Sequence, residues 1–246
     1  MREHLICAAE SHIGHVREKN EDSYAIINDG RFPFVLIIAD GMGGHRSGEV
    51  ASQIAVNFVR DQIVELRQED RSAEDWCRLI SDLVEKANVR VCLDACQDED
   101  KRGMGTTLTI ALVLTDAVVI THVGDSRAYL LRDGVLVQMT DDHTLVQEMV
   151  AAGTISPEES AGHPHRHVLT RALGTPEHVV PDHLILPREK HDRYLLCTDG
   201  LHGYVADRQI ESVMRHGKDP AGLVEQLIRL ALEAGGEDNI TVLAAY

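Results

Sequence analysis

The chain has 246 residues, 43% of them hydrophobic and 4% aromatic, and its formal net charge is −16 at pH 7. A chain of this length can bury a sizeable core without dividing, so we expect one domain over residues 1–246. The negative charge argues against nucleic acid or an anionic membrane surface as the main partner, because both are polyanions.

No apolar run is long enough to cross a bilayer, and an odd number of cysteines describes no disulfide framework. We therefore expect a cytoplasmic protein with reduced thiols, and we expect it to be a monomer. Cys92 and Cys96 lie four residues apart on a predicted helix and could share one face of a metal site, but no second pair completes such a site.

Apolar periodicity in the first hundred residues predicts three short strands followed by two helices. The strands are expected at 5–10, 24–27 and 34–39, with a polar loop at 11–22. Residues 47–65 and the stretch from Ser72 onward have helical spacing, and we expect both helices to cover one face of a sheet. Ser72 followed by two acids has the pattern of a helix N-cap.

The rest of the chain predicts a strand meander followed by alternating strands and helices. Strands are expected at 108–114, 118–123, 128–131, 135–137, 179–186, 193–199 and 240–246. Asp133-Gly134 is typical of a hairpin turn. One helix is expected at 141–152 and another from Asp219-Pro220, with Asp219 as its N-cap, while 154–175 is expected to be a loop. Periodicity alone supports a mixed α+β domain rich in antiparallel strands.

Acidic residues recur where predicted strands begin or end. Asp40 closes the apolar run of 34–39 and precedes three glycines within four positions. Asp199 and Asp238 occupy similar surroundings, and Asp22 lies just before 24–27. A carboxylate at a buried strand end needs a metal, a cation or hydrogen-bond donors, and Asp40 could simply cap a strand-to-helix turn. Recurrence favours one shared site, and carboxylates without histidine or thiolate suit Mg²⁺ or Mn²⁺.

Six motifs occur along the chain: Arg17-Glu18-Lys19-Asn20-Glu21-Asp22, Asp40-Gly41-Met42-Gly43-Gly44, Gly103-Met104-Gly105-Thr106-Thr107, Gly124-Asp125-Ser126-Arg127, Asp199-Gly200 and Asp238-Asn239. Their order and approximate spacing resemble those of the metal-dependent PP2C (PPM) family of serine/threonine protein phosphatases, and the chain is most similar to its compact bacterial branch. The resemblance implies a central β-sandwich of two antiparallel sheets flanked by α-helices on both sides. It also implies a flap subdomain at about 143–178 beside the active site.

The resemblance assigns roles to the motif residues. Two Mn²⁺ or Mg²⁺ ions would be held by Asp22 (through water), Asp40, the carbonyl of Gly41, Asp199 and Asp238. Arg17 would hold the substrate phosphate, because a guanidinium can donate two hydrogen bonds to one phosphoryl group. Asp125 would bind a third, weaker ion; alternatively, it is only the acid of an Asx-turn.

The implied function is hydrolysis of phosphoserine and phosphothreonine by a metal-activated water, with phosphorylated proteins as partners, including a bacterial serine/threonine kinase or its substrates. The alternatives are a regulatory or binding module of the same fold, and a phosphatase of anti-sigma antagonist proteins. Met42 stands where eukaryotic members of the family often carry a histidine, so the general acid is left open between His45 and a metal-bound water. His163, His165 and His167 alternate, and form either a histidine metal site or a solvated loop.

Overall fold

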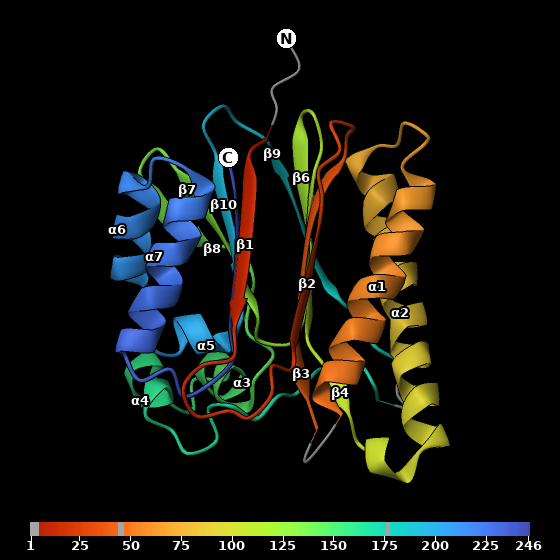
Figure 1. Ribbon diagram of the computed structural model, residues 1–246, viewed down its shortest axis with the longest axis vertical. Helices are drawn as coiled ribbons and strands as arrows, with labels where there is room; N and C mark the ends of the chain where they lie inside the picture. The colour runs from red at the N-terminus through yellow and green to blue at the C-terminus, as the bar shows by residue number, and fades with distance from the viewer. Residues whose placement is uncertain (1–4, 44–46, 176–177) are drawn as a thin grey trace.

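The computed structural model describes residues 5–43, 47–175 and 178–246, and its centre is a sandwich of two antiparallel sheets (Figure 1). The first sheet contains, in spatial order, β1 (Cys7–His12), β11 (Ile240–Ala245), β10 (Arg193–Cys197), β7 (Arg127–Arg132) and β8 (Val135–Gln138). The second contains β2 (Asp22–Ile27), β3 (Phe34–Met42), β5 (Leu108–Val113), β6 (Ala117–Val123) and β9 (Asp182–Pro187), with β4 (Gly105–Thr106) paired to β3. The predicted sandwich is confirmed.

Strand β3 shows why its sequence is an unbroken apolar run. Phe34, Leu36 and Ile38 pack in the cluster between the two sheets, whereas Val35 and Ile37 pack on the opposite face against helices. Because side chains alternate along a strand, a strand that is covered on both faces must be apolar at every position. Burial of both faces therefore holds the polar end of β3 in a defined place.

Helices cover the outer face of each sheet (Figure 1). The second sheet is covered by α1 (Gly48–Leu66) and α2 (Ala73–Gln97), and the first by α6 (Asp207–His216) and α7 (Pro220–Glu233). Two predicted caps are confirmed: the side chain of Ser72 accepts a hydrogen bond from the Asp75 amide, and that of Asp219 accepts one from the Gly222 amide. No helix in the described part of the chain is long and apolar enough to cross a membrane.

The helix predicted at 141–152 begins later than expected, as α3 (Leu145–Ala151). Thr144 is its N-cap and accepts a hydrogen bond from the Gln147 amide at 3.3 Å. The carboxylate of Asp142 instead accepts hydrogen bonds from the Arg127 guanidinium, the shorter at 2.7 Å. The ion pair with a distant strand therefore prevails over the favourable interaction of an acid with a helix N-terminus.

Other boundaries also differ from the prediction. The strands expected at 5–10 and 179–186 are found at Cys7–His12 and Asp182–Pro187. The predicted loop at 154–175 contains α4 (Pro157–Ala161), whose N-cap Ser156 forms a capping box. The short helices α5 (Asp199–His202) and η1 (Glu99–Lys101) were not predicted. Their lengths are too small for an apolar period to be visible in sequence.

Candidate active site

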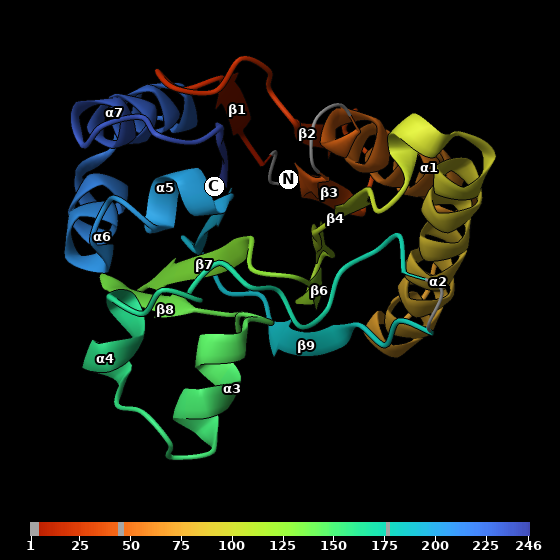
Figure 2. The same ribbon diagram turned by 90° about the horizontal axis from the view of Figure 1, so that it is seen from below.

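The ends of the elements that carry the predicted acids lie at one end of the sandwich, the lower end in Figure 1 and the end facing the viewer in Figure 2. Asp22 opens β2 and lies directly opposite Asp40 of β3 in the strand register. Asp199 begins α5 immediately after β10, Asp238 precedes β11, and Asp125 lies in the turn between β6 and β7. Antiparallel neighbours bring the end of one strand beside the start of the next, which gathers these positions.

Asp40 shows that the carboxylates are close enough to repel one another. Burial is the largest cause that raises the pKa of Asp40 well above its ordinary value. Like charges on other acids of the site add to that shift, and they belong to Asp22, Asp199, Asp125 and Asp238. A bound cation would relieve this repulsion.

Asp22 is held by two threonines from the opposite sheet. Its Oδ2 accepts hydrogen bonds from Thr241 at 2.6 Å and from Thr198 at 3.0 Å. Its Oδ1 is buried and has no hydrogen-bond partner among the described residues. Burial raises the pKa of Asp22 to about 7, although the two threonine hydrogen bonds oppose the rise. An unpartnered buried oxygen in a cluster of acids is a suitable place for a cation or an ordered water.

Asp199 differs from its neighbours because cationic groups surround it. Burial alone would raise its pKa, but a hydrogen bond from His167 and the charges of nearby side chains outweigh burial and lower it. The Nδ1 atom of His167 lies 3.5 Å from Oδ2 of Asp199. Of the three alternating histidines, His167 contacts a predicted site acid. The other two, His163 and His165, contact each other, with their ring centroids 5.6 Å apart.

Asp125 is 8% exposed, and burial, followed by the charge of Asp199, raises its pKa well above the ordinary value. Among the described residues, its carboxylate accepts no hydrogen bond from the amide two residues further on, as an Asx-turn acid would. Its carbonyl oxygen lies 3.0 Å from Nε2 of His202, a partly buried side chain of α5 that the sequence did not single out. Asp125 is therefore a buried acid beside Asp199, and the two roles predicted for it remain a ligand of a third ion and the acid of an Asx-turn.

Arg17 lies at the mouth of the site, on the loop between β1 and β2. Its Nη2 donates a hydrogen bond to Oδ2 of Asp238 at 2.7 Å, and half of its side chain is exposed. Burial disfavours the charged guanidinium and by itself would lower the pKa of Arg17. The charge of Asp238 and its hydrogen bond outweigh burial, so the pKa is raised. Together with Asp40, Gly41 and Asp238, the guanidinium lines a cavity of about 640 Å³. The arginine is therefore charged, accessible and adjacent to the acids.

Asn239 is a positioning residue whose role the sequence did not reveal. Its Oδ1 accepts a hydrogen bond from the Glu21 amide at 2.8 Å, and its Nδ2 donates to the carbonyls of Ile13 and Lys19, both at 2.9 Å. These three bonds join β11 to both ends of the loop that carries Arg17. The only signal in the sequence is that Asn239 follows Asp238 directly.

The backbone around Asp40 is fixed by the two threonines of the Gly-Met-Gly-Thr-Thr motif. Thr107 Oγ1 accepts a hydrogen bond from the Asp40 amide at 2.8 Å, and Thr106 Oγ1 donates to the Asp40 carbonyl at 2.9 Å. Gly41 follows, and a Cβ there would lie 2.1 Å from the carbonyl oxygen of Gly48. A glycine is therefore required where β3 passes the first turn of α1.

The donor set fits hard divalent ions. It consists of carboxylate oxygens that repel one another, with one buried oxygen of Asp22 left unpartnered. Among residues 5–43, 47–175 and 178–246, no three His, Cys, Asp or Glu side chains already converge as ligands. The acids have other partners instead. Asp22 accepts hydrogen bonds from threonines, Asp199 contacts His167, and Asp238 forms an ion pair with Arg17.

The sequence offers two candidates for the general acid, His45 and a metal-bound water. Met42 lines the cavity beside Asp40, and its thioether has no proton to donate. His45, the protein candidate, lies outside the described residues.

Carboxylates gathered at one end of a sandwich, with an exposed arginine beside them, suit a metal-dependent hydrolase of phosphate esters. The more particular assignment comes from comparison with known proteins. The family model for protein phosphatase 2C matches residues 10–238, and the chain belongs to this family.

Relatives with curated names support the assignment. The chain is 39% identical over 234 residues to the serine/threonine phosphatase stp of Listeria monocytogenes, covering 94% of this chain and 91% of the relative. It is 40% identical over 238 residues to the serine/threonine protein phosphatase PstP of Mycobacterium tuberculosis, covering 97% of this chain and 44% of that longer protein.

Solved structures agree. The M. tuberculosis phosphatase PstP/Ppp superimposes with a TM-score of 0.86 at 41% identity, covering 98% of this chain and 97% of that one. The catalytic domain of PstP in complex with 2 manganese ions superimposes with a TM-score of 0.84 at 39% identity, covering 98% of this chain and 97% of that chain. The manganese ions are a property of that relative.

Proposed function

We propose that the protein removes phosphate from phosphoserine and phosphothreonine in proteins, at the carboxylates gathered round Asp40. Membership of the family makes it a metal-dependent phosphoprotein phosphatase. The observation that supports this location is the cluster of acids in which burial, followed by the charges of the neighbouring carboxylates, raises the pKa of Asp40, beside a cavity that Arg17 lines. A bound cation would offset the repulsion between these acids and favour their ionised form at neutral pH.

The residues that would hold two Mn²⁺ or Mg²⁺ ions are Asp22, Asp40, Gly41 (through its carbonyl), Asp199 and Asp238. When bound, these ions supply charge neutralisation and activation of the attacking water. Asp22, held by Thr198 and Thr241, would orient first-sphere water through its free Oδ1. The contact of His167 with Asp199 would have to open for that carboxylate to act as a ligand.

Arg17 would bind the phosphoryl group of the substrate. Its guanidinium can donate two parallel hydrogen bonds to the non-bridging oxygens and so stabilise charge that develops there. Its present bond to Asp238 holds it beside the acids, and Asn239 holds the loop that carries it. Arg17 would then release the carboxylate of Asp238 and bind the phosphate instead. The loop that carries Arg17 would not have to move.

Asp125 is the proposed ligand of a third, weaker ion shared with Asp199. Its burial and the raised pKa that Asp199 helps to cause support this role. Asp125→Ala is expected to keep the melting temperature and the two tighter ions, but to lower kcat and to change its dependence on Mn²⁺ concentration. Lowered melting with unchanged kinetics would show that the acid is structural.

The partners would be phosphorylated proteins, including a serine/threonine kinase or its substrates. The test of the reaction is hydrolysis of p-nitrophenyl phosphate with and without Mn²⁺, repeated on a phosphothreonine and a phosphotyrosine peptide. We expect Mn²⁺-dependent turnover that favours phosphothreonine and is lost in Asp40→Asn. Turnover that persists in the presence of a chelator, or in Asp40→Asn, would refute the proposed site.

A further inference from the structure

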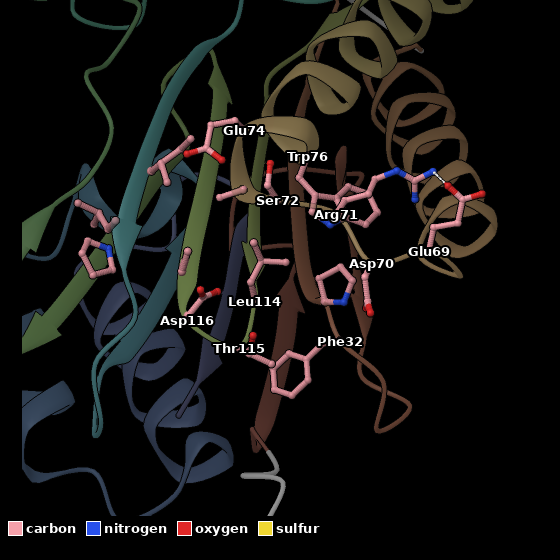
Figure 3. A pocket seen from close by; sticks show the side chains of 16 residues that line it. Phe32, Glu69, Asp70, Arg71, Ser72, Glu74, Trp76, Leu114, Thr115 and Asp116 are labelled. Atoms are coloured by element: carbon pink, nitrogen blue, oxygen red, sulfur yellow. Dashed lines mark hydrogen bonds and ion pairs between the residues drawn. The ribbon is translucent and has the colours of Figure 1, made fainter.

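A second cavity, of about 490 Å³, lies at the opposite end of the sandwich from the acids. It lies between the connection of α1 to α2, the β5–β6 turn and the end of β9 (Figure 3). Its apolar lining includes Phe32, Trp76, Leu114, Ile185 and Pro187. We call it the Trp76 pocket. Its volume lies within the range of about 300–1,000 Å³ that is usual for binding sites.

The wall of the pocket is formed by interactions within the protein. The Arg71 guanidinium lies over the Trp76 ring, 5.6 Å from its centroid, donates to the Leu66 carbonyl at the end of α1 and pairs with Glu69 at 2.8 Å (Figure 3). Trp76 itself is 1% exposed. The shape of the pocket therefore does not depend on a bound molecule.

Apolar surface remains open to solvent within this wall. Ile185 is 37% exposed, Pro187 is exposed and Phe32 is partly exposed. Exposed apolar side chains that gather in a cavity, rather than lying scattered over the surface, mark binding surfaces. A partner that enters the pocket would cover them.

The rim of the pocket is acidic. Glu69, Asp70, Glu74 and Asp116 are all exposed lining residues, and Figure 3 shows them spread round the apolar side chains. Arg71 is the one Lys or Arg in the lining, and it is already paired with Glu69. Neither Asp70 nor Glu74 forms an ion pair with a cation of the described residues. The rim therefore has a negative charge available to a partner.

We propose that the Trp76 pocket docks a segment of a partner protein in which a large apolar side chain is flanked by lysine or arginine. The apolar side chain would enter above Trp76, and the basic residues would face Asp70, Glu74 and Asp116. The pocket lies near Phe34 and the catalytic acids near Asp40, so the length of β3 separates them by roughly 20 Å. Docking and hydrolysis can therefore occur at different places on one partner.

Trp76 is the sole tryptophan of the sequence, so intrinsic fluorescence reports directly on the pocket. The probe is the peptide acetyl-Lys-Arg-Phe-Leu-Arg-Lys-amide, titrated into the complete chain. We expect a saturable change in Trp76 emission below about 1 mM peptide, weakened by added salt. Two matched peptides, with acids in place of the basic residues or with glycines in place of Phe-Leu, should cause no saturable change. Equal responses to all three peptides, or none to the first, would overturn the proposal.

The double variant Asp70→Asn/Glu74→Gln tests the rim. It should weaken binding of the basic peptide by about 2- to 30-fold, the combined worth of two exposed ion pairs. The matched control is Asp82→Asn/Glu225→Gln, which removes the same charge from exposed positions of α2 and α7 outside the lining and should leave binding unchanged. Equal weakening in both variants would show non-specific attraction and overturn the proposal.

A second copy of this chain is the competing occupant. Sedimentation of the unliganded protein distinguishes it, because self-association that the rim variant abolishes would assign the pocket to a dimer and overturn the proposal. Binding is measured by Trp76 emission and not by turnover, so its failure would leave the proposed phosphatase activity untouched.

Discussion

The two ends of the sandwich use the same side chain, a carboxylate, in opposite ways. At the candidate active site the acids lie close to one another, and burial raises the pKa of Asp22 and Asp40. At the Trp76 pocket Asp70 and Glu74 are exposed on the rim of an apolar cavity. Burial makes a carboxylate a strong attractant for cations, whereas exposure in water leaves it a weak contribution to recognition.

The largest effect is expected from Asp40→Asn. It removes one charge from the cluster and keeps the shape, so the fold should persist and melting without metal should stay the same or rise. Mn²⁺-dependent turnover should fall at least ~100-fold, since loss of a few kcal/mol of transition-state stabilisation has that consequence. Steady-state kinetics and thermal melts with a chelator check both outcomes, and near-normal turnover would remove Asp40 from the site.

Arg17→Ala should have the next largest effect, because it removes a group that contacts the substrate and not the ions. Losing a charge-assisted hydrogen bond lowers kcat/KM by about 10- to 150-fold. Mn²⁺ affinity, measured by calorimetry, should be unchanged or slightly tighter, since Asp238 is released from its ion pair. Loss of Mn²⁺ binding instead would contradict the assignment of Arg17 to phosphate.

A smaller effect is expected on the pH dependence of the melting temperature, which should distinguish the acids of the site from exposed acids. The pKa of Asp22 is raised to about 7 in the folded protein, whereas an unfolded chain has a value near 4. Below the unfolded value the protonated acid contributes its full stability to the fold. This contribution is lost as pH rises toward 7, because the unfolded chain releases the proton first. In metal-free protein, Asp22→Asn should therefore raise the melting temperature more at pH 8 than at pH 5, by about 2–4 °C for each kcal/mol.

The comparison with wild type is needed because burial lowers the pKa of His122 to about 3 and that of His202 to about 4. These histidines destabilise the fold as pH falls, but they do so equally in both proteins and cancel in the difference. Asp82→Asn, at an exposed position, is the matched control and should show no such trend. A pH-independent difference for Asp22→Asn would show that its carboxylate is not protonated on folding.

The smallest effect is expected at the far end. Asp70→Asn/Glu74→Gln should change Mn²⁺-dependent hydrolysis of p-nitrophenyl phosphate less than about twofold, and stability by less than about 0.5 kcal/mol, as is usual for surface positions. The assay uses a small substrate that cannot span the two ends. A marked loss of turnover would show that the two ends are coupled and do not act independently.

Much of the architecture could be predicted from local patterns. The apolar run of β3, the Ser72 and Asp219 caps and the turn at Asp133, whose φ of 52° is left-handed, each depend on residues that are neighbours in sequence. The helix predicted at 141–152 begins only at Leu145, because the carboxylate of Asp142 pairs with Arg127, which lies on β7. Local propensity cannot anticipate a competitor that only the fold brings near.

The sequence by itself determined which residues could form a carboxylate site, because acids that close buried strands must find a cation or donors. Only the tertiary structure decided how each acid is held: Asp22 by threonines of the opposite sheet, Asp199 beside His167, and the Arg17 loop by Asn239. The Trp76 pocket likewise arises where distant segments meet. Sequence periodicity specifies which face of an element is buried, whereas sheet pairing and packing choose the residues that meet there.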